Sequence, residues 1–223
     1  FLKVNKCEFN SQINPKKLSL NINKWIYSEL ISTKNLAEKH LENYRFDEAT
    51  RVIYKFVWNS YCDWYLELSK TILSSNNKKD IKEVKATSGF IFKEILILLH
   101  PFIPFITEEL WLKNKLGNKK EKYLMYVNWI KDNKARKDKE ITDVNQVIDL
   151  ISRIRSFKNE LSVSPGSFID ISVQSVSKNK QNLFLNNEIM LKKLGRINSI
   201  FTKDSANESA TLVISGEIFK IYF

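Results

Sequence analysis

The sequence predicts a mainly α-helical fold, in which an antiparallel helix bundle is followed by a small α+β subdomain. Apolar residues recur at helical spacing through most of the first 117 residues. Glycine and proline are scarce, with 5 Gly and 4 Pro in 223 residues, which argues against a turn-rich β architecture. Beyond residue 166 the pattern changes to the two-residue alternation that is typical of strands.

The first half of the predicted bundle consists of two long helices. Residues 1–20 are expected to form the end of a preceding helix and a polar connector. An amphipathic helix should then occupy residues 21–43. Asp47 is a suitable N-cap for a second helix, which should continue to about residue 73. This helix is apolar around much of its circumference, so it should lie at the centre of the bundle.

The second half of the bundle turns at a double-proline corner. Asp80, with Glu83 three residues later, resembles a capping box for a third helix that ends at His100. Pro101 lacks a backbone N–H and should push the preceding residue out of the helical region. Pro104 suits the first turn of a fourth helix, which should end at a left-handed glycine. That glycine is Gly117, so residues 21–117 are predicted to form the bundle.

The rest of the chain is expected to form a connector and a second domain. Residues 118–140 form a basic connector that contains a short strand at 123–129. Residues 141–223 are predicted to form a helix and a small α+β subdomain. Its elements are expected at 141–161 and 183–194 for helices, and at 168–173, 209–214 and 217–223 for strands.

Charge and cysteine content restrict the class of protein. The net charge of +11 suggests a polyanionic partner, although the basic residues are spread along the chain and lysine is over-used together with asparagine and isoleucine. No run of about 18 apolar residues is present, so no transmembrane helix is expected. Cys7 and Cys62 are too few for a disulfide framework or a zinc site. Two reduced thiols fit a cytoplasmic protein.

Several motifs together resemble one protein family. The segments are Asn23–Ile26, Asn43–Ala49, Phe56–Lys70, Leu98–Trp111, Ile154–Pro165 and Ser215–Glu217. In order and spacing they resemble the anticodon-binding region of class I aminoacyl-tRNA synthetases of the Val/Ile/Leu subgroup. The Cys-Asp-Trp-Tyr-Leu-Glu phrase at 62–67 is similar to the valine enzymes in particular.

The resemblance implies that the parent enzyme is a monomer that joins valine to its tRNA with ATP and Mg²⁺. The catalytic and editing domains of the same polypeptide would be partners of this region. The His-x-Gly-His and Lys-Met-Ser-Lys-Ser signatures are absent, so the fragment should be inactive alone and hold no cofactor or metal. Two alternatives stay open: the equivalent domain of an isoleucyl- or leucyl-tRNA synthetase, and a non-catalytic helical scaffold that binds a protein.

The same resemblance assigns the candidate RNA contacts. Phe1 matches the last residue of a family Ala-Arg-Phe phrase and would stack on an anticodon base, with Leu66 as the opposite wall. Lys70, one helical turn from Leu66, would reach a phosphate. Arg153 and Arg155 lie two residues apart on a helix and face different ways, so one of them would contact the RNA backbone. The aromatic residues Trp58, Trp64 and Tyr65 are expected in the core instead.

Overall fold

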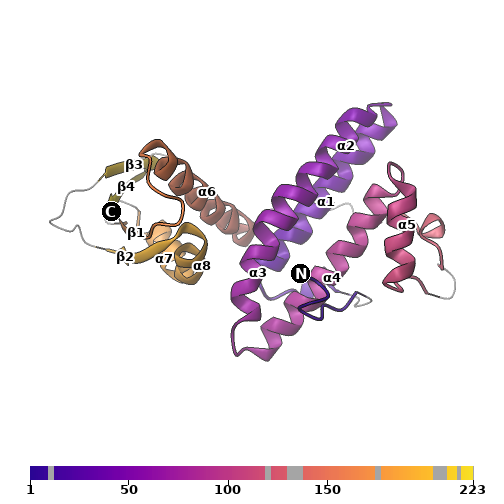
Figure 1. Cartoon of the computed structure of the whole chain (residues 1–223), viewed down its shortest axis with the longest axis horizontal. Coiled ribbons are helices and arrows are strands. Elements are labelled where there is room, and N and C mark those ends of the chain that lie inside the picture. Colours follow the sequence, from indigo (N-terminus) through magenta and orange to yellow (C-terminus); the bar gives the residue numbers. More distant parts are fainter. Residues whose placement is uncertain are drawn as a thin grey trace. The chain divides into compact units, whose positions relative to one another are not determined.

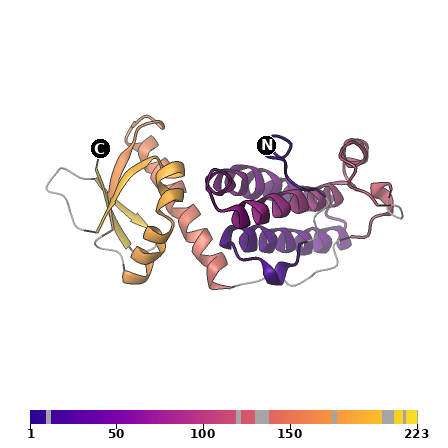
Figure 2. The ribbon, with the colours of Figure 1, turned by 90° about the horizontal axis from the view of Figure 1, so that it is seen from below.

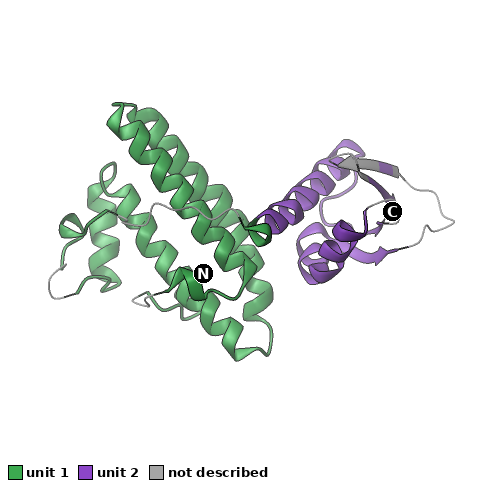
Figure 3. Ribbon diagram, turned by 180° about the vertical axis from the view of Figure 1, so that it is seen from behind, with its two compact units in different colours: residues 1–141 green, residues 142–223 purple. Residues whose placement is uncertain are grey.

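Helices form the first part of the chain, and a sheet with covering helices forms the last part (Figure 1). This computed structural model describes residues 1–9, 13–118, 122–129, 138–173, 177–202, 210–214 and 217–222. The chain divides into two units, unit 1 with residues 1–141 and unit 2 with residues 142–223 (Figure 3). The predicted fold, a helix bundle followed by a small α+β part, is confirmed.

Unit 1 consists of long helices that pack side by side (Figure 2). Its elements are η1 Pro15–Lys17, α1 Asn21–Glu42, α2 Phe46–Lys55, η2 Phe56–Tyr65, α3 Leu66–Leu73, α4 Lys78–Leu99, α5 Pro104–Lys113 and η3 Leu124–Tyr126. η2 is a π-helix that joins α2 directly to α3, so one helical rod runs through all three. α1 contacts α2, η2 and α4, and α3 also contacts α4.

The carboxylate of Glu83 in α4 caps the N-terminus of α1. It accepts hydrogen bonds from the backbone N–H groups of Ser19 (3.1 Å) and Leu20 (2.9 Å). It also accepts one from Asn23 Nδ2 (2.9 Å), and Asn23 Oδ1 accepts another from the buried Tyr65 hydroxyl (2.8 Å). Burial opposes ionisation of Glu83, but the hydrogen bonds it accepts hold its pKa below the usual value. One carboxylate therefore connects α4, α1 and the α2–η2–α3 rod.

The capping box predicted at the start of α4 is consequently wrong. Asn77 is the N-cap, and its Oδ1 accepts hydrogen bonds from the N–H groups of Lys79 (3.1 Å) and Asp80 (3.4 Å). Asp80 therefore lies in the first turn of α4. Glu83 is turned instead toward the residues that lead into α1, where it accepts hydrogen bonds from the N–H groups of Ser19 and of the N-cap Leu20.

Asp47 is not the N-cap of α2 either. The helix begins one residue earlier, at Phe46, and its N-cap Arg45 makes no capping hydrogen bond through its side chain. Asp47 and Glu48 lie in the first turn, where negative charge complements the helix dipole. The residue type correctly indicated a helix start, but the N-cap lies two positions earlier than predicted.

The double-proline corner forms at the predicted place. Pro104 is the first residue of α5, as expected. His100, however, keeps helical dihedral angles (φ −56°, ψ −39°), so Pro101 does not displace it. The N–H of His100 bonds to Leu96 O (3.0 Å), and its Nδ1 lies 2.8 Å from Thr107 Oγ1. The first bond keeps His100, the C-cap of α4, in helical continuation, and the second holds it against α5 in spite of the following proline.

The segment after α5 departs from the prediction. The helix ends at Lys113, and the left-handed residue is Lys115 (φ 53°) rather than Gly117. The earlier end lets the N–H of Leu116 bond to Trp111 O (3.1 Å), and both of these side chains are buried. The strand predicted at 123–129 is instead the 3₁₀ turn η3, whose Leu124 is buried in the same cluster.

Unit 2 is a four-stranded sheet with helices on one face (Figure 2). Its elements are α6 Lys139–Glu160, which begins at the end of unit 1, β1 Ile169–Ser172, α7 Lys178–Asn186, α8 Glu188–Gly195, β2 Ile197–Phe201, β3 Ala210–Ile214 and β4 Glu217–Tyr222. The strand order is β2-β1-β4-β3, with β1 parallel to β2 and the other pairs antiparallel. The helix expected at 183–194 is two helices, α7 and α8, and β2 was not predicted.

The helices carry no membrane signature. Within the described part of the chain, no helix has both the length and the apolar character needed to cross a bilayer.

The first prediction concerns the Glu83 carboxylate. Glu83→Gln should lower the free energy of unfolding by about 1–2 kcal/mol, because an amide cannot accept all the hydrogen bonds that the carboxylate accepts. Chemical denaturation of both proteins at neutral pH measures the difference. The difference should shrink at acid pH, where the wild-type carboxylate also becomes neutral and its stabilising effect is lost. Glu109→Gln, at an exposed position of α5, is the control and should be neutral. Equal stability of both variants would contradict the assigned role.

A second prediction concerns Glu94, a buried residue of α4. Desolvation raises its pKa to about 7, whereas the pKa of a glutamate in an unfolded chain is about 4.3. Between these two pH values the folded state therefore binds one proton more than the unfolded state. The free energy of unfolding falls as the pH rises through this range. Glu94→Gln should be near neutral at pH about 4 and stabilising by roughly 2–3 kcal/mol at pH about 8. Denaturation curves across this range test it, and a pH-independent effect would refute it.

Candidate nucleic-acid interface

An apolar pocket of about 600 Å³ lies in unit 1, and we call it the N-terminal pocket. Phe1 and Leu66, which the sequence placed on opposite walls of one site, both line it. The other lining residues come from the N-terminal segment, η2, α4 and α5. They are Leu2, Lys3, Phe9, Val57, Tyr61, Cys62, Phe92, Ile95, Leu96, Leu99, Leu110, Lys113 and Asn114.

The chain start is folded onto the bundle by its own turns. The carbonyl of Phe1 accepts hydrogen bonds from the N–H of Asn5 (3.0 Å) and from Asn5 Nδ2 (2.9 Å). The N–H of Cys7 bonds to Leu2 O (2.9 Å), and Cys7 is buried. Lys6 adopts a left-handed conformation (φ 52°) that closes the turn. Phe1 is thereby held, half-buried, in the pocket wall.

A glycine on α4 makes room for this segment. A β-carbon at Gly89 would lie 2.1 Å from Glu8 O and 2.6 Å from Glu8 C. Only a residue without a side chain therefore allows α4 to touch the backbone at Glu8. Phe92, three residues further along α4, lines the pocket and packs against Phe9 with ring centroids 5.7 Å apart. The docking of the chain start depends on these two contacts.

The π-helix sets the opposite wall. The rings of Tyr61 and Tyr65 stack with centroids 5.8 Å apart, and the Tyr61 hydroxyl donates to Ser88 O (2.9 Å). Burial raises the pKa of both phenols, so both stay protonated donors. Leu66 is the first residue of α3 and is half-buried. These hydrogen bonds hold the rod in place on the bundle, so the position of Leu66 is fixed.

Lys70 does not join Phe1 and Leu66. Its side chain, 48% exposed, pairs with Glu67 on the same helix (2.5 Å), and Lys70 is not among the residues that line the pocket. Lys3 and Lys113 line it instead, and no carboxylate of the described residues pairs with either. Sequence reasoning missed both, because nothing in the local pattern indicates that the chain start meets the end of α5.

The two predicted arginines of α6 are separated as expected. Arg153 pairs with Asp149 one turn earlier (3.2 Å). Arg155 donates hydrogen bonds from Nε (3.2 Å) and Nη2 (2.8 Å) to Leu194 O. Arg155 thus satisfies a carbonyl at the C-terminal end of α8, whereas Arg153 bonds to Asp149 within α6, and both arginines are exposed.

The expected core positions of the three aromatic residues are only partly correct. Tyr65 is fully buried and Trp64 is half-buried. Trp58 is wrong, because 57% of it is exposed. Its ring stacks on that of Tyr54, at a centroid distance of 6.3 Å and an interplanar angle of 11°. The π-helix changes the residue count per turn, so the helical spacing used to place Trp58 does not hold there.

Comparison with known proteins agrees with this architecture. The family described as the anticodon-binding domain of tRNA ligases matches residues 23–173. The chain is 56% identical over 223 residues to valine–tRNA ligase of Pelagibacter ubique, covering 100% of this chain and 25% of that protein. It is 34% identical over 218 residues to valine–tRNA ligase of Agrobacterium fabrum, covering 97% of this chain and 23% of that protein.

Gly89→Ala is predicted to detach the chain start while leaving the helices intact. The added methyl group would overlap the backbone at Glu8, whereas alanine itself favours a helix. Trypsin should then cleave after Lys3 and Lys6 much faster than in the wild type, with little change in circular dichroism. Gly166→Ala is the matched control, because its β-carbon would meet only Ser164 Oγ at 3.9 Å. Equal cleavage rates in the wild type and the Gly89 variant would show that the segment is not held this way.

The chain spans about a quarter of the length of these relatives. The family match covers more than half of the chain itself, from α1 through β1. The helix order, the double-proline corner and the α+β part all lie within or directly after the matched residues. The chain therefore belongs to the family of anticodon-binding domains of tRNA ligases.

Proposed function

We propose that this chain is the anticodon-binding part of a valine–tRNA ligase and that its N-terminal pocket receives an anticodon base. The observation that carries the proposal is that Phe1 and Leu66, 65 positions apart in the chain, line one apolar pocket. RNA is read by splaying loop bases onto flat and apolar side chains while cations hold the phosphates. Lys3 and Lys113 supply that positive charge beside the apolar walls.

The proposal also includes the other three predicted RNA contacts, Lys70, Arg153 and Arg155, but with different roles. Lys70 would bind a phosphate by leaving Glu67, since an exposed ion pair of this kind contributes little stability. Arg153, also in an exposed ion pair, is the better candidate of the two α6 arginines for the RNA backbone. Arg155 would act indirectly, because its guanidinium holds the end of α8.

The full-length protein is proposed to be a cytoplasmic monomer that joins valine to tRNA at the expense of ATP, with Mg²⁺. The reaction rests on the names of the two relatives reported above, both valine–tRNA ligases. ATP, Mg²⁺, the cytoplasmic location and the monomeric state rest on the family resemblance of the sequence. The present chain would bind the anticodon stem-loop of valine tRNA. The remaining domains of the polypeptide would carry out the aminoacylation.

The proposal predicts a base preference that depends on Leu66. The wild type should bind a valine anticodon stem-loop more tightly than an isoleucine one. Leu66→Glu should weaken binding of the valine stem-loop by about 10-fold or more and remove the preference over the isoleucine stem-loop, because it places a carboxylate against the stacked base. A fluorescence anisotropy titration with both loops measures this.

The control and the alternatives fit the same experiment. Leu36→Glu adds the same charge at an exposed leucine of α1, which does not line the pocket, and should change little. Binding that prefers the isoleucine loop would indicate the isoleucine enzyme instead. Binding that ignores both salt and loop sequence would indicate a protein-binding scaffold, since contacts to phosphates weaken steeply with salt. Equal binding of all loops by the wild type and the Leu66 variant would end the anticodon-reader proposal.

A further inference from the structure

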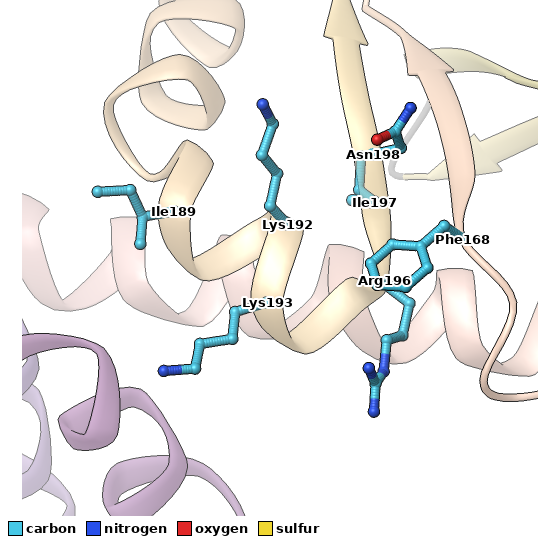
Figure 4. A pocket seen from close by; sticks show the side chains of 7 residues that line it. All are labelled: Phe168, Ile189, Lys192, Lys193, Arg196, Ile197 and Asn198. Carbon is cyan, nitrogen blue, oxygen red and sulfur yellow. The ribbon is translucent and has the colours of Figure 1, made fainter. Parts of the chain in front are cut away.

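Unit 2 has a second group of cations, gathered around Arg196 (Figure 4). A pocket of about 490 Å³, which we call the Arg196 pocket, is lined by Phe168, Ile189, Lys192, Lys193, Arg196, Ile197 and Asn198. A smaller pocket of about 290 Å³ adjoins the same arginine and includes Arg155 and Lys158. None of the sequence-based predictions used Lys193 or Arg196.

Two of these cations maintain the fold. Lys158, which is buried, donates to Ser167 O (2.8 Å) and Gly195 O (3.2 Å) and approaches Arg196 O (3.5 Å). Arg155 donates to Leu194 O. Both therefore satisfy carbonyl groups at the C-terminal end of α8 and its junction with β2, as cations at a helix C-terminus commonly do. They leave Arg196 and Lys193 with no such task.

The backbone at Arg196 is unusual for its residue type. It is left-handed (φ 54°, ψ 49°) at the C-cap of α8, a conformation that favours glycine or asparagine. The neighbouring Gly195 is required at its own position, because it is buried and a β-carbon on it would lie 2.9 Å from Ile197 Cδ1. Gly195 and Arg196 therefore could not exchange places without a steric cost. Lys6 and Lys115 adopt the same left-handed conformation, so the backbone at Arg196 shows only that its side chain is held at this position without a glycine.

The left-handed backbone brings the guanidinium of Arg196 beside an exposed ring. The guanidinium carbon lies 5.7 Å from the centroid of Phe168, and Figure 4 shows the two side chains next to each other. Phe168 is 59% exposed although it is a large apolar side chain. Lys193 projects from α8 away from the guanidinium, to the lower left in Figure 4, whereas Arg196 points downward. A flat ring and a guanidinium plane are thus presented together to solvent.

Within the described part of the chain, the cations near Phe168 differ in whether a carboxylate pairs with them. Lys192 pairs with Glu188 (2.7 Å), so its charge is largely neutralised. No carboxylate among the described residues pairs with Lys193 or Arg196, and both are exposed. Complementing the helix dipole would explain one cation at this position. It does not explain an arginine held over an exposed phenylalanine.

We propose that the Arg196 pocket is a second RNA-binding site, which holds the RNA backbone outside the anticodon loop. Arg196 binds a phosphate group, Lys193 binds a neighbouring phosphate, and the nucleotide beside Arg196 rests on the exposed ring of Phe168. The inference rests on the proposed function in one respect, since it takes the ligand to be RNA. It requires no base preference, because phosphates carry no sequence information.

Three variants of the whole chain test the site. Arg196→Gly removes the cation and suits the left-handed backbone, so it should fold at least as well as the wild type. Arg196→Lys keeps the charge and should retain most of the affinity. Phe168→Ala removes the ring alone. Lys178→Gln, which removes an exposed lysine at the start of α7, is the charge-matched control.

The probes are a transcript of the whole valine tRNA and its isolated anticodon stem-loop, titrated at several salt concentrations. For the whole tRNA, Arg196→Gly and Phe168→Ala should weaken binding by about 5- to 10-fold. Arg196→Gly should also reduce the slope of log Kd against log salt by about 0.7–0.9. The preference for valine over isoleucine loops should be unchanged, which separates this site from the N-terminal pocket.

Two results would overturn the proposal. If Arg196→Gly binds whole tRNA with the wild-type affinity and salt slope, the cations serve only the end of α8. If Lys178→Gln loses as much affinity as Arg196→Gly, the effect comes from net charge and not from a site. A loss of loop preference in the Leu66 variant, with no effect of the Arg196 variants, would support the anticodon pocket and reject this second site.

Discussion

The fold of unit 1 depends on one carboxylate. Glu83 reaches from α4 to the exposed N–H groups at the start of α1, and through Asn23 it connects to the buried Tyr65 hydroxyl. Without it, the N–H groups of Ser19 and Leu20 would lose their acceptor, and the Asn23–Tyr65 pair would lose its link to α4. The network fixes three helices relative to one another before any apolar contact is counted. The walls of the N-terminal pocket are built on those helices.

The helices were predictable because their signals are local. Apolar residues at helical spacing and the prolines at 101 and 104 indicated α1, α4 and α5 at nearly the correct positions. Caps were less predictable, because Glu83 matches a local capping box but is used by a helix 60 positions away. β2 was missed since its five residues, Ile197–Phe201, pair with β1 through a crossover that no local pattern shows.

The candidate sites divide in the same way. Phe1 and Leu66 came from a family resemblance, and the structure does bring them into one pocket. Lys3 and Lys113 were missed because they meet only after the chain start folds back over α4, which Gly89 permits. Arg196 was missed because its importance lies in a backbone conformation, and a sequence shows the residue type but not the sign of φ.

The π-helix η2 determines how the number of residues in the rod relates to the faces that α2 and α3 bury. Each i→i+5 turn contains about one residue more than an α-turn, and one residue corresponds to about 100° of rotation around a helix. Deleting a single residue between Phe56 and Tyr65 could convert η2 to a regular α-helix without breaking the rod. Because the lost residue is the one that the wider π-turn accommodates, α2 and α3 would keep their faces. Ala49 and Ile53 would stay in the core, and Leu66 would stay at the pocket. A one-residue change in length is therefore absorbed within η2 and does not reach the faces of α2 and α3.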